Sequence, residues 1–96
     1  KRWLATADSH ASGSVTVNEG AERALADKSR LTSLLPIGIE AIDGHFSQGD
    51  VIQIRNPAGR VIGCGRSRYD HEEAHDLIGK RGQKALIHYD YLYLLD

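Results

Sequence analysis

One stretch near the middle of the chain constrains the fold more than any other, because it has the pattern of a β-hairpin. Residues 51–55 (VIQIR) are rich in β-branched side chains, which is typical of a strand. Residues 56–59 predict a tight turn, in which Pro57 fixes its φ angle and Gly59 permits a positive one. Residues 60–68 then predict the returning strand, so an antiparallel pair is expected here.

Further short strands are predicted on both sides of this hairpin. Residues 14–17 are β-branched and alternate in polarity. Residues 37–42 alternate after Pro36, which has no N–H to donate to a central ladder and should mark where that strand begins or bends. Residues 85–95 alternate apolar, aromatic and polar side chains and predict the final strand. With the hairpin, the chain has about five or six short strands.

Two stretches have the signals of short helices. Asn18 can cap a helix over residues 19–28, and Asp70 can cap a second helix that reaches Ile78 and ends at Gly79. The strands follow one another as a meander with the helices near the ends. This pattern favours a small, mainly β, barrel-like domain over a βαβ sandwich.

Composition narrows the class of protein. A chain of 96 residues is expected to form one domain, and no apolar run reaches the roughly 20 residues of a membrane helix. Cys64 is the single cysteine, so no internal disulfide can form, and the expected location is the reducing cytoplasm. Twelve Lys and Arg against 13 Asp and Glu give a net charge of −1, whereas dedicated nucleic-acid binders usually carry a basic excess. Any nucleic-acid binding would therefore depend on how the cations are arranged.

One string matches a metal-binding pattern. Residues 71–75 read HEEAH, and two histidines four apart on a helix can hold zinc while the glutamate activates water. A catalytic zinc needs a third protein ligand, for which Asp90 is the plausible downstream carboxylate. The alternative, which we favour, is a solvated helix face with unrelated histidines. The glycines at residues 63–65 and 79 match no phosphate-binding loop either. From both observations together we predict no metal site and no catalytic residue in this chain.

Cations gather on the returning strand of the predicted hairpin and in the loop after the second predicted helix. Their guanidinium and ammonium groups suit phosphate oxygens, but a charge run more often forms a solubilising exterior, and we favour that alternative. Tyr89, Tyr91 and Tyr93 alternate on the predicted last strand, where they could stack bases or cover one side of the barrel. The members of this second basic patch are Arg66, Arg68, Lys80, Arg81 and Lys84.

Several strings, in their order and spacing, resemble one known family. Residues 15–21 (VTVNEGA), 33–39 (SLLPIGI) and 44–52 (GHFSQGDVI) are similar to the C-terminal PUA domain of bacterial glutamate 5-kinase, also called γ-glutamyl kinase. Residues 1–5 (KRWLA) resemble the link between the two domains of that enzyme. The resemblance covers nearly the whole chain.

The resemblance divides the chain into an interdomain linker remnant, residues 1–13, and a PUA domain, residues 14–96. It implies a pseudo-barrel of mixed strands with two helices. It also implies that the full-length enzyme phosphorylates glutamate with ATP, the first step of proline biosynthesis, at ATP, glutamate and magnesium sites in an N-terminal kinase domain. This chain would then be non-catalytic and hold no cofactor of its own.

The same resemblance implies the partners. They are the kinase domain in cis, structured RNA, and further copies in a homo-oligomer of the full-length enzyme, with no membrane. The alternative to RNA binding is a module that regulates or assembles the kinase domain through proline feedback, metal dependence or oligomerisation. In PUA domains generally, RNA meets the first helix, the glycine-containing segment after it and the last strand. Mapped onto this sequence, the candidate RNA-binding residues are Arg23, Lys28, Arg30, Ile37, Gly38 and His88.

Overall fold

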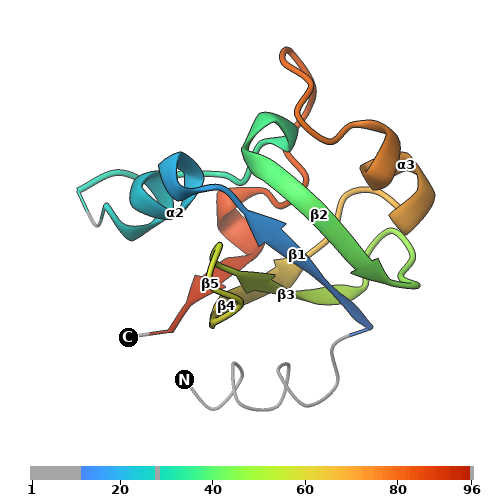
Figure 1. Ribbon diagram of the computed structural model, residues 1–96, viewed down its shortest axis with the longest axis horizontal. Helices are drawn as coiled ribbons and strands as arrows, with labels where there is room; N and C mark the ends of the chain where they lie inside the picture. The colour runs from blue at the N-terminus through green and yellow to red at the C-terminus, as the bar shows by residue number, and fades with distance from the viewer. Residues whose placement is uncertain (1–11, 28, 96) are drawn as a thin grey trace.

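A computed structural model describes residues 12–27 and 29–95 of the chain (Figure 1). Most of the predicted linker, residues 1–13, lies outside these residues, as does Lys28. None of the described helices is long and apolar enough to cross a membrane. The elements in chain order are β1 (Gly13–Val17), α2 (Glu19–Ala26), η1 (Pro36–Gly38), β2 (Ile39–Gly44), β3 (Val51–Arg55), β4 (Val61–Arg66), α3 (His71–Asp76), η2 (Tyr89–Tyr91) and β5 (Leu92–Leu94), where η marks a short 3-10 helix.

The described strands form one mixed sheet in the order β2-β1-β3-β4-β5. β3 and β4 pair antiparallel, which confirms the hairpin, and the predicted mainly β class with mixed strands and two short α-helices is confirmed as well. The simple meander is wrong at β1, which pairs antiparallel with β2 and parallel with β3. Alternation along a strand indicates which face is buried, but it does not indicate which strand lies beside it.

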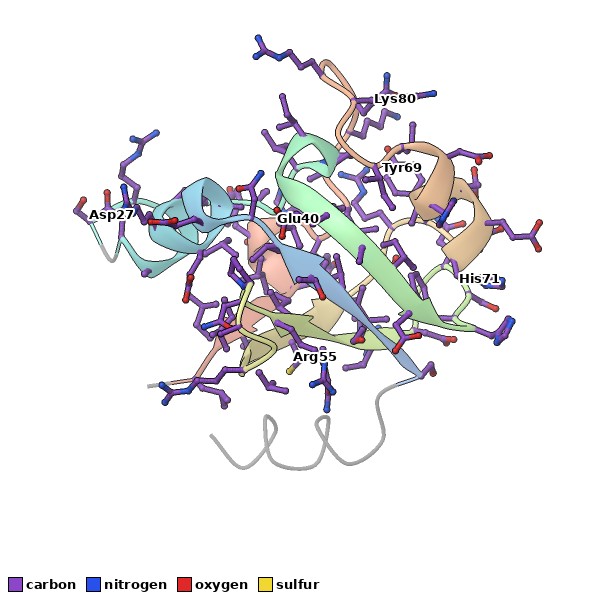
Figure 2. The ribbon with its side chains drawn as sticks, in the orientation of Figure 1. Asp27, Glu40, Arg55, Tyr69, His71 and Lys80 are labelled. Atoms are coloured by element: carbon purple, nitrogen blue, oxygen red, sulfur yellow. The ribbon has the colours of Figure 1, made fainter. Side chains whose placement is uncertain are left out.

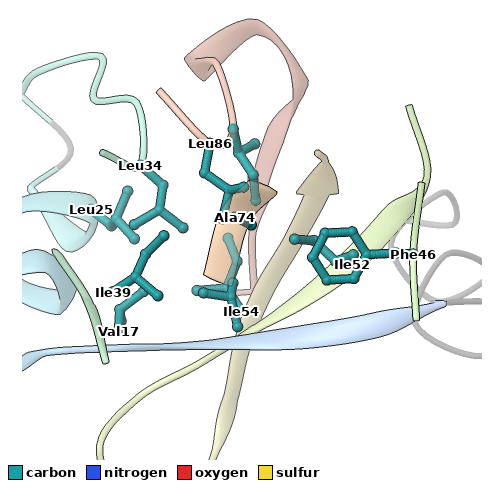
Figure 3. Packing of buried hydrophobic residues seen from close by; sticks show 11 residues of the cluster. Val17, Leu25, Leu34, Ile39, Phe46, Ile52, Ile54, Ala74 and Leu86 are labelled. Atoms are coloured by element: carbon teal, nitrogen blue, oxygen red, sulfur yellow. The ribbon is translucent and has the colours of Figure 1, made fainter. Parts of the chain in front are cut away.

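The core lies on one face of this sheet (Figure 3). α2 covers it through Leu25 and α3 through Ala74, and the segments around Leu34 and Leu86 complete the cover. Gly65 of β4 allows this close packing, because an added Cβ would lie 2.5 Å from Ile87 Cγ2. The buried cluster comprises Val15, Val17, Leu25, Leu34, Ile39, Phe46, Ile52, Ile54, Ala74, Leu86 and Ile87.

Both α-helices begin where their caps predict. Asn18 Oδ1 accepts from the Ala21 N–H at 2.8 Å, and Asp70 Oδ1 accepts from the Glu73 N–H at 2.9 Å. α2 is shorter than predicted and ends at Ala26, because Asp27 adopts an extended conformation and its carboxylate accepts from Ser29. α3 likewise ends earlier than predicted, at Asp76, and a turn follows as far as Gly79, which has a positive φ.

The predicted last strand, residues 85–95, is wrong over most of its length. Residues 85–88 make only an isolated bridge, between Leu34 and Ile87, and η2 then interrupts the chain before β5. His88 causes the interruption, because its Nδ1 accepts from the Asp90 N–H at 3.2 Å and its carbonyl accepts from the Tyr91 N–H at 2.9 Å. Two of the three alternating tyrosines therefore lie on a 3-10 turn, and the three do not share one strand face.

Candidate nucleic-acid interface

An open, mainly apolar cleft of about 300 Å³ lies between α2 and residues 32–38. On one side, α2 contributes Ala24 together with Gly20 and Ala21, which lie four and three residues before it and therefore on the same side of the helix. Because glycine has no side chain and alanine has only a methyl group, these residues fill little of the cleft. On the other side, Leu35 and Ile37 line the cleft and remain 48% and 36% exposed.

Gly38 determines how closely η1 approaches α2. A Cβ added at Gly38 would lie 2.7 Å from the Ala21 Cβ, a distance that real Cβ atoms do not reach. Gly38 is one of the candidate RNA-binding residues named from the sequence, and the group that lies against its backbone in the structure is α2. Asn18 holds the two elements together, because its N–H donates to the Gly38 carbonyl at 2.8 Å and its Nδ2 donates to the Ile37 carbonyl at 3.5 Å.

The outer wall of the cleft is fastened to the C-terminal part of the chain. The Leu34 N–H donates to the Ile87 carbonyl at 2.9 Å. Ser33 Oγ accepts from the Tyr89 N–H at 2.9 Å, which places η2 directly behind the cleft. His88, a predicted site residue, is therefore a neighbour of this wall. Its ring lies 4.3 Å from that of Tyr89, centroid to centroid, and its Nδ1 lies 3.6 Å from an Asp90 carboxylate oxygen.

Arg23 and Arg30, the described cations among the candidate RNA-binding residues, do not line the cleft. Arg23 forms an ion pair with Glu19 one helical turn earlier. Arg30 follows Asp27, whose pKa is lowered first by the Ser29 hydroxyl, then by the Ser29 N–H, and least by the charge of Arg30. Lys28 lies outside the described residues. The described cations on this side of the cleft thus have carboxylates beside them.

The predicted second basic patch is divided in the structure. Arg66 has the same strand parity as Cys64, whose side chain packs with Val51 outside the main core, so it projects from the outer face of the sheet. Arg68 lies beside the C-terminal segment, because its N–H donates to the Leu86 carbonyl at 2.7 Å. The remaining three members, Lys80, Arg81 and Lys84, are exposed on the loop after α3 (Figure 2).

One of the two HEEAH histidines, His71, anchors α3. His71 Nδ1 lies 3.0 Å from the Phe46 carbonyl, which can only accept, so this nitrogen carries the proton and fastens α3 to the loop before β3. His71, Glu72 and His75 border a shallow hollow beside Ile42. Within residues 12–27 and 29–95, no group of three His, Cys, Asp or Glu is placed to hold a metal ion, so the zinc hypothesis lacks its third ligand there.

Sequence reasoning named some of the residues in and around this cleft. It named Ile37 and Gly38, which line the cleft, and His88, which adjoins it. It missed Ser33 and Leu35 as members of the wall, although both stand in the SLLPIGI string. The signal that identifies Ser33 is its contact with a residue 56 positions away, which no local pattern contains.

Comparison with protein families and curated proteins gives a consistent result. The PUA domain family matches residues 13–89. The chain is 44% identical over 95 residues to a glutamate 5-kinase of Chlorobaculum tepidum, covering 99% of this chain and 26% of that protein. It is 36% identical to a glutamate 5-kinase of Bacteroides thetaiotaomicron, covering 98% of this chain and 26% of that protein. The chain thus spans about a quarter of the length of these relatives, and the resemblance stated from the sequence is confirmed.

Solved structures share the fold. A PUA domain from Aeropyrum pernix, in a tartrate complex, superposes with a TM-score of 0.71 at 23% identity over 80% of this chain and 41% of its own. A conserved PUA domain protein from Thermoplasma acidophilum gives 0.60 at 33% identity over 76% and 45%. A chain of an archaeal box H/ACA sRNP Nop10-Cbf5 complex gives 0.64 at 16% identity over 78% and 22%.

Proposed function

This chain belongs to the PUA domain family, and from that membership we propose that it is the C-terminal, RNA-binding module of a glutamate 5-kinase. In this proposal the chain itself carries no catalytic residue. Phosphorylation of glutamate, with ATP and magnesium, takes place in a kinase domain of the same protein in the cytoplasm and begins proline biosynthesis. The bound partner is a structured RNA that presents unpaired nucleotides.

The observation that carries the proposal is the apolar cleft between α2 and η1. Proteins recognise unpaired nucleotides by packing the faces of the bases against aromatic or apolar side chains, with polar groups nearby for the base edges. The exposed Leu35 and Ile37 offer such a surface, and Thr32 and Ser33 add hydroxyl groups to the lining. The fold neighbour from a box H/ACA sRNP supports the choice of RNA, since an sRNP is a particle of protein and RNA.

Filling the cleft tests the proposal. Ala24→Phe places a large ring in the lining of the cleft, whereas Ala26→Phe places the same ring on the same helix outside the lining. We expect Ala24→Phe to weaken the binding of a fluorescently labelled RNA hairpin with an unpaired 3′ extension by about tenfold, the loss of roughly one stacked base. Ala26→Phe should bind like the unmodified chain. Anisotropy titrations that find equal affinity for both variants would contradict the cleft as the RNA site.

A different surface, the edge of the sheet at β5, supports a second function. β5 is an edge strand, and Tyr91 and Leu95 beside it remain 52% and 48% exposed. An exposed edge with large apolar side chains is a typical surface for contact with another protein domain. Because the relatives are about four times as long as this chain, the occupant we propose is the kinase domain of the same protein. The module would then regulate or assemble that kinase.

A further inference from the structure

We propose that the loop of residues 80–84 belongs to the same surface as the cleft and supplies its phosphate contacts. The loop carries Lys80, Arg81 and Lys84, and we call it the basic loop. The inference rests on the proposed RNA-binding function, and it assigns the electrostatic part of that function to residues on the side of η1 opposite α2. The cations of α2 then have a minor part.

Backbone contacts place the basic loop beside η1. The Gly79 N–H donates to the Pro36 carbonyl at 3.0 Å, so the loop leaves α3 directly against the element that lines the cleft. In Figure 1, η1 lies between α2 on one side and the protruding loop on the other. The far end of the loop is also fixed, because Tyr69 Oη donates to the Lys84 carbonyl at 3.0 Å. Anchoring at both ends lowers the entropy lost when the loop binds a partner.

The charges of the basic loop are uncompensated among the described residues. Within residues 12–27 and 29–95, no carboxylate lies within 4.0 Å of the charged nitrogens of Lys80, Arg81 or Lys84. Arg23, by contrast, is paired with Glu19. A cation without an ion-pair partner loses no ion pair when it meets a phosphate, so the basic loop is a better phosphate site than Arg23.

The place of these cations in the fold decides between the two interpretations of them, a phosphate-binding site and a solubilising exterior. Charges on a remote face would only solubilise the domain, as the sequence alone favours. The basic loop instead adjoins the apolar, exposed Ile37, and Arg68 lies at its base through the backbone contact to Leu86. An RNA strand has apolar base faces on one side and phosphates on the other. Bases held in the cleft would therefore bring the following phosphates across η1 onto the basic loop.

The test removes two charges in each of two places. Lys80→Ala with Arg81→Ala alters the basic loop. Arg60→Ala with Arg66→Ala removes the same charge from the β3–β4 turn and from the outer face of the sheet. For the labelled RNA hairpin with an unpaired 3′ extension, we expect the loop variant to bind about tenfold more weakly. The slope of the logarithm of its association constant against the logarithm of salt concentration should become less negative by roughly 1.5. The control variant should change the slope by less than about 0.5.

The outcomes separate this inference from the proposed function. If Ala24→Phe weakens RNA binding about tenfold while the loop variant binds with an unchanged slope, the role of the basic loop is overturned and RNA binding at the cleft stands. Equal losses in the loop and control variants would indicate a response to net charge alone and would overturn the inference. Binding of a poly-glutamate peptide as tightly as RNA would also overturn it. If the unmodified chain binds no RNA at low salt, both proposals fail.

Discussion

At the scale of single residues, glycine placement shapes the candidate interface. Gly38 and Gly20 both border the cleft, but their surroundings differ. The Gly38 backbone is pressed against Ala21, whereas a Cβ at Gly20 would meet only Asn18 Oδ1 at an ordinary distance of 3.5 Å. One glycine is required for packing, and the other costs helix stability without a packing gain.

Matched alanine substitutions check this difference. Gly38→Ala should lower the free energy of unfolding by about 1–3 kcal/mol, because η1 or α2 must shift to accept the new Cβ. Gly20→Ala should raise it by up to about 1 kcal/mol, because alanine is the better helix former. Urea unfolding of both variants provides the comparison. If Gly38→Ala were as stable as the unmodified chain, the close contact with Ala21 would not determine the cleft.

At the scale of elements, the end of α2 shows how a side chain sets a boundary. Apolar spacing alone would allow the helix to continue to residue 28, but Asp27 leaves the helical conformation. Its carboxylate accepts from the Ser29 hydroxyl at 2.6 Å and from the Ser29 N–H at 3.0 Å, and these bonds lower its pKa. The turn that leads toward the cleft wall is therefore held by a charged acceptor.

This boundary should depend on pH. A carboxyl whose pKa is lower in the folded state stabilises that state above its unfolded pKa of about 3.8 and loses this contribution as pH falls through the folded pKa. Asp27→Asn should therefore reduce stability slightly at pH 6, and the difference from the unmodified chain should disappear toward pH 2. Urea unfolding at several pH values measures it. In a Ser29→Ala background the pH-dependent difference should be smaller, and a difference of the same size would exclude Ser29 as its source.

At the scale of the whole molecule, two surfaces are offered to partners. The cleft and the basic loop lie at one end, around η1, and the exposed side chains of η2 and β5 follow the free edge of the sheet. α3 packs against β2 at the opposite edge of the sheet, and among the described residues no strand pairs with the outer side of β5. RNA binding and docking on a kinase domain could therefore occur on the same molecule without sharing residues.

The open edge can be tested in the full-length kinase. Tyr91→Ser with Leu95→Ser should change its oligomer size in sedimentation or its inhibition by proline, because both side chains would lose apolar contact with the kinase domain. Leu31→Ser is the control, since Leu31 is also exposed but belongs to the segment between α2 and η1. If sedimentation and proline inhibition match those of the unmodified kinase, the β5 edge is not the docking surface.

The sequence by itself determined the local elements. The β3–β4 hairpin follows from its turn residues, and both helix starts follow from Asn18 and Asp70, because these preferences act over two to four residues. It also determined which residues alternate into the core, because strand and helix periods are local properties. Even the resemblance to PUA domains rests on short strings in a fixed order.

Only the tertiary structure decided where these elements meet. The place of β1 between β2 and β3, the contact of Gly38 with Ala21, and the hydrogen bond from Gly79 to Pro36 all join residues far apart in the chain. The cleft exists because of the second contact, and the third brings the basic loop to its side. Such contacts form where packing and backbone hydrogen bonding of the whole domain are satisfied together, and no short stretch of sequence contains both partners.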